Sequence, residues 1–264
     1  MVEGYPVFLT DTCTGCNMCV EVCPTAVLKV DPETKVVAYA NRDNCIFCGH
    51  CGAICPTESI SMFGITPESE ENAIKTDPPA VRAVKMARTC RKYHPEPLPK
   101  EDLMKALSIA KYSASSSNIR PLHFTVLSRN LMDTLSLSIA KEVSKNPRYS
   151  KVAALVEKGI DVIFRGAPHM ILMSAPADKA AVAMADASIA GRDIQLNAES
   201  MGLGMFWCGF LLAAVASSQE LHDICGVPEG HKILMAMGIG RPKVKFARPA
   251  LRRNLEEGVD ITFK

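Results

Sequence analysis

The sequence predicts an α+β protein with two domains, a small one at the N-terminus and a larger one after it. The length of 264 residues exceeds that of a usual single domain. Eight of the eleven cysteines lie before residue 56, in two copies of one pattern. The remaining sequence shows several helical apolar periodicities and few strand-like runs. We expect one domain at residues 1–66, a linker at 67–79 and a second domain at 80–264.

The composition is that of a globular protein without a membrane segment. Hydrophobic residues make up 48% of the chain, which is enough for a sizeable core. The longest apolar stretch, 180–201, is interrupted by the charged residues Asp186, Arg192, Asp193 and Glu199. The first residues have neither the basic nor the apolar region of a secretory signal. We therefore expect a cytoplasmic protein.

The net charge of +2 is divided unevenly along the chain. Residues 1–64 contain three basic and seven acidic residues, a net charge of −4, which leaves +6 for the remainder. This division suits an acidic electron-transfer module joined to a body that binds an anion. The basic residues form no dense stripe, and there are one Trp and five Tyr, so we do not expect nucleic-acid binding.

The cysteine pattern carries the most chemical information. Each copy has the form C-x2-C-x2-C-x3-C-P, and the second copy follows the first by 32 residues. Three closely spaced cysteines can surround one side of an iron–sulfur cubane, while the fourth, before proline, binds the other cluster. The pattern therefore predicts two 4Fe–4S clusters. One is expected on Cys13, Cys16, Cys19 and Cys55, and the other on Cys45, Cys48, Cys51 and Cys23.

Zinc and disulfides are the alternatives for these cysteines. Zinc sites pair two C-x2-C knuckles and need no third cysteine at this spacing. Disulfides do not suit a chain without a secretory signal. The cysteine repeat resembles a bacterial-type two-cluster ferredoxin over residues 5–64. The other three cysteines, Cys90, Cys208 and Cys225, are scattered, and we expect them to be small buried apolar residues.

The remaining elements follow from apolar pattern and turn residues. Between the two cysteine frames, residues 27–30 and 35–39 predict a hairpin around a turn at 31–34. A polar stretch at 66–72 precedes Pro78 and Pro79, as in a linker. The pattern then predicts helices at 80–86, 99–111, 131–144, 149–164, 178–201 and 217–225, the fifth being long and central. Strands are expected at 169–174 and 231–238.

Several short motifs in the second domain occur together in one order. There is no G-x-G-x-x-G after a strand and no phosphate-loop lysine motif, so a Rossmann or P-loop nucleotide site is not expected. The segments are 88–93 (RTCRKY), 115–121 (SSSNIRP), 167–168 (AP), Asp186 with 189–190, 202–209 (GLGMFWCG) and 237–242 (MGIGRP), followed by Arg248 and Pro249. This set resembles the nitroreductase family of FMN enzymes, from about residue 80 to 250.

The resemblance implies an FMN domain with a central sheet, surrounding helices and a set of cofactor contacts. Guanidinium groups suit a phosphate dianion. By resemblance, Arg88, Arg91 and Arg248 would bind the FMN phosphate with Thr89. Ser115 and Asn118 would hold the ribityl chain and the ring edge, with Arg120 in place of the usual glutamine. By resemblance, the backbone at Cys208 and Gly209 would run beside flavin N5. The sequence departs from the family at Ala87, where a second arginine is usual, at Ala114, where proline is usual, and at Lys245, where the basic residue is shifted.

Simpler interpretations of these residues remain open. Arg88 and Arg91 could face solvent at a helix end. Asn118 could be only a turn former. The glycines at 202 and 204 could be only a helix C-cap. The six histidines share no spacing and are not expected to be ligands.

Taken together, the two resemblances suggest a ferredoxin–nitroreductase fusion that acts as an FMN-dependent oxidoreductase. The clusters would relay electrons from a low-potential donor such as ferredoxin to FMN, which would reduce a nitroaromatic, a quinone or an activated alkene. No protein acid or base is expected in catalysis. The family implies a homodimer, with the tail at 252–264 around the partner. The alternatives are an electron carrier or assembly subunit with a non-catalytic flavin domain, and an NAD(P)H-dependent nitroreductase.

Overall fold

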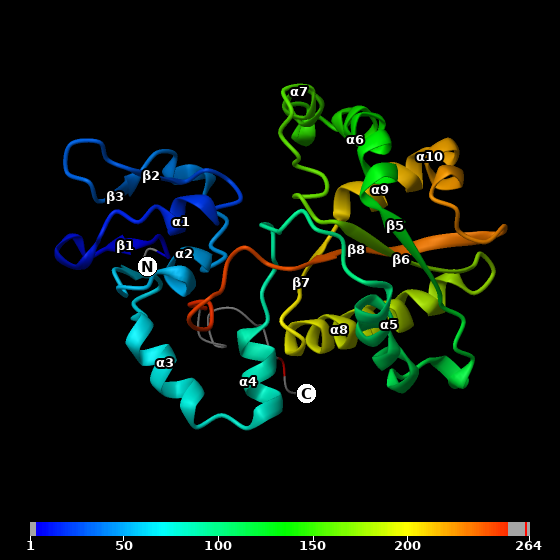
Figure 1. The fold of residues 1–264 in the computed structure, drawn as a ribbon, viewed down its shortest axis with the longest axis horizontal. Helices are drawn as coiled ribbons and strands as arrows, with labels where there is room; N and C mark the ends of the chain where they lie inside the picture. Colours follow the sequence, from blue (N-terminus) through cyan, green and yellow to red (C-terminus); the bar gives the residue numbers. More distant parts are fainter. Residues whose placement is uncertain (1–3, 253–261, 263–264) are drawn as a thin grey trace. The chain divides into compact units, whose positions relative to one another are not determined.

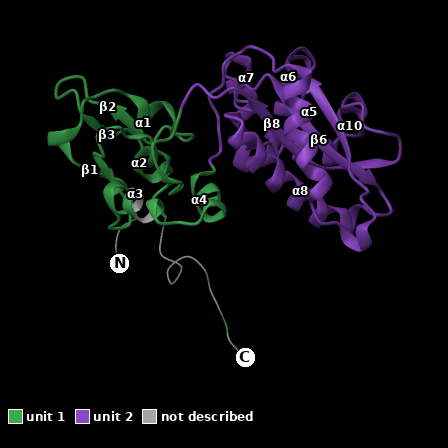
Figure 2. Ribbon diagram, turned by 60° about the horizontal axis from the view of Figure 1, so that its bottom comes forward, with its two compact units in different colours: residues 1–87, 245–264 green, residues 88–244 purple. Residues whose placement is uncertain are grey.

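The computed structural model describes residues 4–252 and 262 (Figure 1). The chain divides into two compact units (Figure 2): residues 1–87 with 245–264, and Arg88–Val244. The division differs from the predicted boundaries, because the segment after Val244 returns to the first unit. The predicted linker also differs, because it contains a regular helix, α3 (Pro67–Lys75), with Thr66 as its N-cap. The predicted partner-wrapping tail lies almost entirely outside the described residues.

The first unit contains two small antiparallel sheets and short helices. Strand β1 (Val7–Phe8) pairs with β4 (Ile60–Ser61), and β2 (Leu28–Val30) pairs with β3 (Val37–Tyr39). The second pair confirms the predicted hairpin, and the carboxylate of Asp31 accepts hydrogen bonds from the backbone of Glu33 and Thr34 in its turn. The helices are α1 (Met18–Glu21), α2 (His50–Ile54), α3 and α4 (Pro79–Met86).

The two cysteine frames fold in the same way. A 3₁₀ turn precedes the first cysteine of each frame, η1 (Thr10–Thr12) and η2 (Arg42–Asn44). A left-handed residue then starts the helix that follows, Asn17 with φ 66° and Gly49 with φ 71°. The sequence repeat is therefore also a structural repeat.

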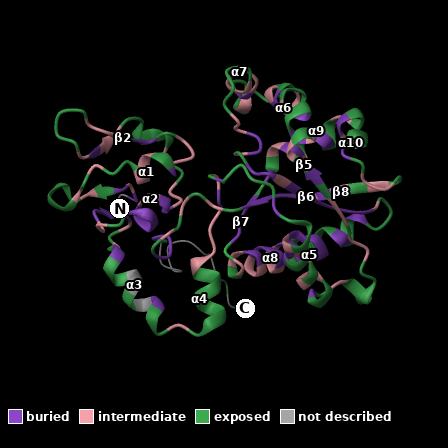
Figure 3. Cartoon of the chain, viewed as in Figure 1, coloured by how far each residue is buried: buried purple, intermediate pink, exposed green. Residues whose placement is uncertain are grey.

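The second unit is built on a four-stranded antiparallel sheet in the order β5-β6-β8-β7. The strands are β5 (His123–Ser128), β6 (His169–Pro176), β8 (His231–Gly240) and β7 (Gly204–Trp207). Strand β6 is buried on both faces along most of its length (Figure 3). Its side chains alternate between the two faces, as the strand geometry requires.

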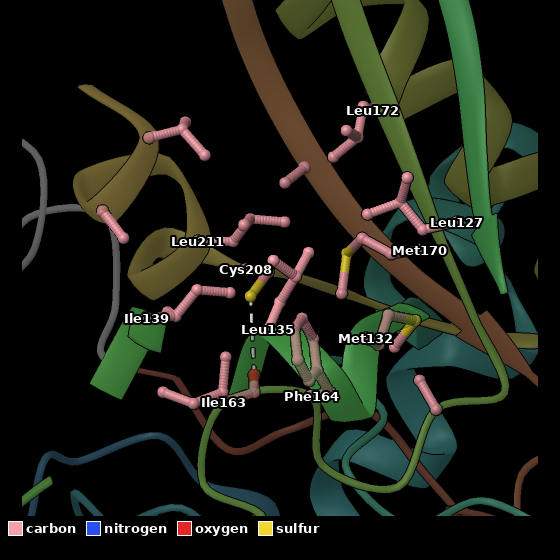
Figure 4. Close-up of a cluster of buried hydrophobic side chains, with 14 of the residues drawn as sticks. Leu127, Met132, Leu135, Ile139, Ile163, Phe164, Met170, Leu172, Cys208 and Leu211 are labelled. Carbon is pink, nitrogen blue, oxygen red and sulfur yellow. Dashed lines mark hydrogen bonds between the residues drawn. The ribbon is translucent and has the colours of Figure 1, made fainter. Parts of the chain in front are cut away.

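Helices cover both faces of this sheet. On one face, Met170 and Leu172 pack with α6 (Arg129–Ser144) and α9 (Gly209–Ser217) in a cluster that includes Leu135 and Leu211 (Figure 4). On the other face, Ile171 and Met173 pack with α5 (Lys100–Ser108) and α8 (Ala180–Ser200). The remaining helical elements are η3 (Ile109–Tyr112), η4 (Ser116–Asn118), η5 (Pro147–Tyr149), α7 (Val152–Glu157) and α10 (Gln219–Ile224).

The predicted elements are confirmed in kind, with some differences in extent. The long helix is confirmed as α8. The helix expected at 149–164 is wrong in length, because only Val152–Glu157 is helical and the chain then turns. Strands β5 and β7 and helix α9 were not predicted. Within the described part of the chain, no helix is both long and apolar enough to cross a membrane.

Candidate functional site

The cysteines of the first unit line two pockets. The first pocket is lined by Cys13, Cys16, Cys19 and Cys55, and the second by Cys45, Cys48, Cys51 and Cys23. Each pocket therefore takes three cysteines from one frame and the fourth from the other frame. This is the crossed grouping that the spacing predicts for two cubane clusters. The pockets have the same empty volume, about 340 Å³.

The fourth cysteine of each frame accepts a backbone hydrogen bond at its sulfur. The N–H of Val27 donates to Cys23 Sγ at 3.3 Å, and the N–H of Ser59 donates to Cys55 Sγ at 3.3 Å. The residue before each donor is left-handed, Ala26 with φ 52° and Glu58 with φ 57°, which turns the amide back toward the sulfur. Such bonds stabilise a thiolate and tune the potential of a bound cluster.

Burial raises the pKa of three of the pocket thiols. Burial and the nearby thiols of Cys55 and Cys16 together raise the pKa of Cys19 to about 12. Burial also raises the pKa of Cys51 and of Cys45. A bound iron centre supplies positive charge and deprotonates its thiol ligands. A bound cation would therefore ionise Cys19, Cys45 and Cys51 in pockets that otherwise keep these three thiols neutral.

The cysteines of each pocket fit a cubane cluster better than a single zinc ion. A zinc site pairs two C-x2-C knuckles and needs no third cysteine at this spacing. Each pocket instead collects three cysteines from one frame and a fourth from the other, as two cubane clusters require.

In the second unit, the predicted flavin residues near Arg88 lie along strand β7. Thr89 forms a parallel bridge with Met205, and the N–H of Cys90 donates to the Met205 carbonyl at 2.8 Å. The N–H of Arg88 donates to the Glu199 carboxylate at 3.2 Å. Gly204 permits this close approach, because a Cβ there would lie 2.7 Å from Cys90 Sγ. The segment 88–91 is therefore held at the edge of the sheet.

Cys208 and Gly209 follow directly after β7, where helix α9 begins. The N–H of Cys208 donates to the Ala236 carbonyl at 2.8 Å, and its sulfur lies 3.4 Å from the Ile163 carbonyl. Burial raises the pKa of this thiol to about 12, so it is neutral at physiological pH. Gly209 is exposed, with open space where a side chain would point.

Arg165 belongs to the same region and was not predicted. Burial lowers the pKa of its guanidinium, and the charge of nearby Arg91 lowers it further. Arg165 has φ 58°, a left-handed conformation that costs a non-glycine residue energy. The sequence signal that could have identified Arg165 is its position directly before Gly166-Ala-Pro. Two neighbouring guanidinium groups are suited to binding an anion.

A carboxylate fixes the loop that carries Arg165. Asp161 accepts hydrogen bonds from the N–H of Phe164 at 2.7 Å and of Gly166 at 2.9 Å. It also pairs with Arg129 at 2.9 Å. Burial by itself would raise the pKa of Asp161, but the two amides and Arg129 outweigh it and lower the pKa. The carboxylate thus stays charged and holds the loop.

Ser115, Asn118 and Arg120 form a second group. The N–H of Arg120 donates to Ser115 Oγ at 3.1 Å, and its Nε donates to Asn118 Oδ1 at 3.0 Å. Left-handed φ values of 48°, 56° and 52° occur at Ser117, Asn118 and Arg120. The buried carboxylate of Asp186 on α8 accepts the N–H of Ser116 at 3.0 Å. The structure therefore brings these three predicted residues together.

The two groups contact opposite parts of helix α8. The 88–91 segment is attached at Glu199, and the 115–120 loop at Asp186. These helix positions are 13 residues apart, about 20 Å along the axis. One chain therefore presents its predicted flavin residues as two separate sets.

Arg248 belongs to the first unit, whereas the residues of both groups belong to the second. It is 4% exposed, and its Nη1 donates to the carbonyls of Cys55 at 2.6 Å and Gly52 at 3.2 Å. Its Nη2 lies 3.2 Å from the Glu58 carboxylate. This placement gives no support to its predicted role at the FMN phosphate, because the guanidinium is used by the cysteine loop.

The fold and the pockets define an iron–sulfur protein joined in one chain to a helix-covered antiparallel sheet. Residues 12–59 match the 4Fe-4S dicluster domain. Residues 84–241 match the nitroreductase family. The chain therefore belongs to the nitroreductase family, as a ferredoxin–nitroreductase fusion.

Comparisons with individual proteins agree with the family. A protein of Methanothermobacter thermautotrophicus that carries the name NADH dehydrogenase/NAD(P)H nitroreductase is 29% identical over 132 residues, 49% of this chain and 60% of its own length. This chain thus spans less than two thirds of that relative. An FMN-bound nitroreductase from Desulfitobacterium hafniense is 22% identical, with a TM-score of 0.60 over 72% of this chain and 100% of its own.

Two further structures share the fold. The FMN-bound nitroreductase of Bacteroides fragilis is 20% identical, with a TM-score of 0.57 over 71% of this chain and 100% of its own. An FMN-dependent nitroreductase from Mycobacterium smegmatis, in complex with NADPH, is 20% identical, with a TM-score of 0.51 over 70% of this chain and 98% of its own. At these identities, the likeness establishes the fold of the second unit.

Proposed function

We propose that this protein is an iron–sulfur flavoprotein oxidoreductase in which two 4Fe–4S clusters supply electrons to FMN. The observation that carries the proposal is the presence of two four-cysteine pockets in the same chain as a nitroreductase-family unit. Cubane clusters carry single electrons at potentials that the protein sets. FMN, when bound, would collect such electrons and pass them on in pairs to a small organic acceptor.

The residues at the edge of β7 would hold the FMN. Arg88 and Arg91 supply charge for the phosphate or another anionic part of the cofactor, and Arg165 adds a third guanidinium close to Arg91. Thr89 is fixed by its bridge to Met205. The amide N–H of Gly209, at the first position of helix α9, would favour a negative charge on the ring. No acid or base of the protein is required by this arrangement.

We further propose a homodimer in which the 115–120 loop of a second copy completes the site. The support is the separation of the two residue groups along α8, which leaves each set incomplete by itself. Helix α8 also exposes the apolar side chains of Val182 (55%) and Ile189 (42%), seven residues apart and therefore on one face. Light scattering of the purified protein tests this, because a monomer at micromolar concentration would contradict it.

The acceptor would be a nitroaromatic, a quinone or an activated alkene, and the donor a low-potential carrier such as ferredoxin. A second candidate has NAD(P)H as the donor. It is favoured by the name of the Methanothermobacter relative and by the NADPH complex of the Mycobacterium enzyme. An electron carrier with a non-catalytic flavin unit is the remaining alternative.

Anaerobic stopped-flow mixing of the whole protein, loaded with clusters and FMN, separates these functions. Flavin reduction that is fast with reduced ferredoxin and slow with NADPH supports the proposal. Reduction by NADPH alone supports the second candidate. If neither donor reduces the flavin, and no nitroaromatic or quinone reoxidises the photoreduced flavin, the protein is not an enzyme of this kind.

A further inference from the structure

The segment after the second unit returns to the cluster pockets. We call residues 245–251 the C-terminal strap. The N–H of Ala247 donates to the Ala53 carbonyl at 3.1 Å, and the ring of Phe246 lies 5.3 Å from that of His50. Ala250 and Leu251 are buried, with exposures of 3% and 0%. All of these contacts are made with the second cysteine frame.

Two glycines of the second frame make room for the strap. A Cβ on Gly49 would lie 2.7 Å from the Leu251 carbonyl oxygen, and a Cβ on Gly52 would lie 2.9 Å from Leu251 Cδ1. At the equivalent positions of the first frame, 32 residues earlier, the sequence has Asn17 and Val20. The repeat therefore departs from symmetry where the strap approaches, which indicates that the strap is part of the cluster-binding unit.

The strap places one buried positive charge beside the cluster ligands. Arg248 is 4% exposed and donates to the carbonyls of Gly52 and Cys55, the latter at 2.6 Å. Cys55 is the residue that crosses to the pocket of Cys13, Cys16 and Cys19. The Glu58 carboxylate lies 3.2 Å from Nη2, and 38% of the Glu58 side chain is exposed.

We propose that Arg248 is a positioning residue that fixes the backbone of Cys55 and raises the reduction potential of the cluster bound by Cys13, Cys16, Cys19 and Cys55. Reduction adds one electron to a cluster that four thiolates already make negative. A buried cation nearby stabilises that added charge, and removing the cation makes reduction harder. The inference rests on the proposed cluster ligation, and it assigns Arg248 a role in electron transfer instead of FMN binding.

Redox titration of the anaerobic whole protein, followed by electron paramagnetic resonance, tests the proposal. Arg248→Met should make one midpoint more negative, changing the oxidised-to-reduced ratio at fixed potential about tenfold, or about 59 mV. The affected cluster should be the one that Cys55→Ser removes. Arg248→Lys keeps the charge and should retain the midpoint. Glu58→Gln removes the opposing charge and should shift the same midpoint to a less negative value.

The outcomes distinguish this inference from the proposed function. Wild-type protein without iron would overturn the cluster assignment itself. Full iron content with both midpoints unchanged in Arg248→Met would overturn only the role of Arg248. If Arg248→Met fails to load iron, Glu58→Gln decides the matter, and an unchanged midpoint in that variant overturns the proposal.

Discussion

Cys55 lies in the second cysteine frame but lines the same pocket as Cys13 of the first frame. Cys23 makes the reciprocal crossing to the pocket of Cys45. The two pockets are thus tied together through the chain, and neither frame contains a complete ligand set. This interdependence has a direct consequence for mutagenesis.

Replacing Cys55 with serine should remove the cluster whose other ligands lie in the first frame. Iron content should fall from about eight per chain to about four, because one cubane is lost. Cys23→Ser should instead remove the cluster of the second frame. The cluster that remains should then give an electron paramagnetic resonance spectrum different from that of Cys55→Ser. Cys225→Ala, at a buried cysteine outside both pockets, is the control and should keep all the iron. Loss of the cluster in the same frame as the mutated cysteine would contradict the crossed ligation.

Arg165→Gln should weaken FMN binding about tenfold to a hundredfold, because one charge-assisted hydrogen bond contributes about 1.5–3 kcal/mol. Arg91→Gln should have a similar effect, since Arg91 is a neighbouring cation of Arg165. Fluorescence titration of the apoprotein with FMN measures both. Arg148→Gln, at an exposed arginine of η5, should leave the affinity unchanged. Equal affinity in all three variants would exclude Arg165 and Arg91 from the flavin site.

Asp161→Asn should lower the free energy of unfolding by about 1–3 kcal/mol at neutral pH, because two amides and Arg129 lose a charged acceptor. Asp133→Asn is the matched control, because Asp133 pairs with the same arginine but is 55% exposed, and it should cost about 0.5 kcal/mol or less. Denaturant unfolding measures both variants.

The stability difference between wild type and Asp161→Asn should depend on pH. The pKa of Asp161 is lowered in the folded protein, so its stabilisation is present above the ordinary aspartate pKa of 3.8 and is lost as pH falls through the folded pKa. The difference between wild type and Asp161→Asn should therefore shrink below about pH 4. A constant difference down to lower pH would contradict the role of this carboxylate.

Gly204→Ala should destabilise the second unit by about 1–3 kcal/mol, because the new Cβ would lie 2.7 Å from Cys90 and push the 88–91 segment away from β7. Gly209→Ala is the control variant, because a Cβ at that position would meet open space. Its free energy of unfolding should equal that of the wild type. Thermal unfolding distinguishes the two. Equal stability of both variants would show that the segment is not held as closely as described.

The sequence predicted the first unit well, because its chemistry is local. Cysteine spacing predicts the two groups of four cysteines that line the pockets, and Asp31 marks the turn of the hairpin between the frames. The long helix α8 was also predictable from its length and apolar content. Strand β7 was not, because it begins at the second of two glycines, Gly202 and Gly204, whose pattern resembles a helix C-cap. Helix α9 is apolar all round, so no periodicity identified it.

The candidate flavin site was only partly predictable. The residues at 88–91 and 208–209 were proposed for the flavin site because short motifs contain them, and the structure places both segments beside strand β7. Arg165 was missed, because its importance depends on a loop fixed by Asp161 and on the proximity of Arg91. Arg248 occupies a family motif position in the sequence, but the chain folds back after the second unit, and the guanidinium donates to the carbonyl of Cys55. Contacts between segments so distant in sequence leave no local sequence signal.

The most direct test of electron flow from the clusters to FMN uses a variant that lacks one ligand of each cluster, Cys16→Ser with Cys48→Ser. Both positions lie in the pockets of the first unit, so the flavin unit keeps all its residues. In anaerobic stopped-flow mixing with reduced ferredoxin, flavin reduction should be orders of magnitude slower than in wild type, while photoreduction of the bound flavin is unchanged. Flavin reduction at the wild-type rate would contradict the relay.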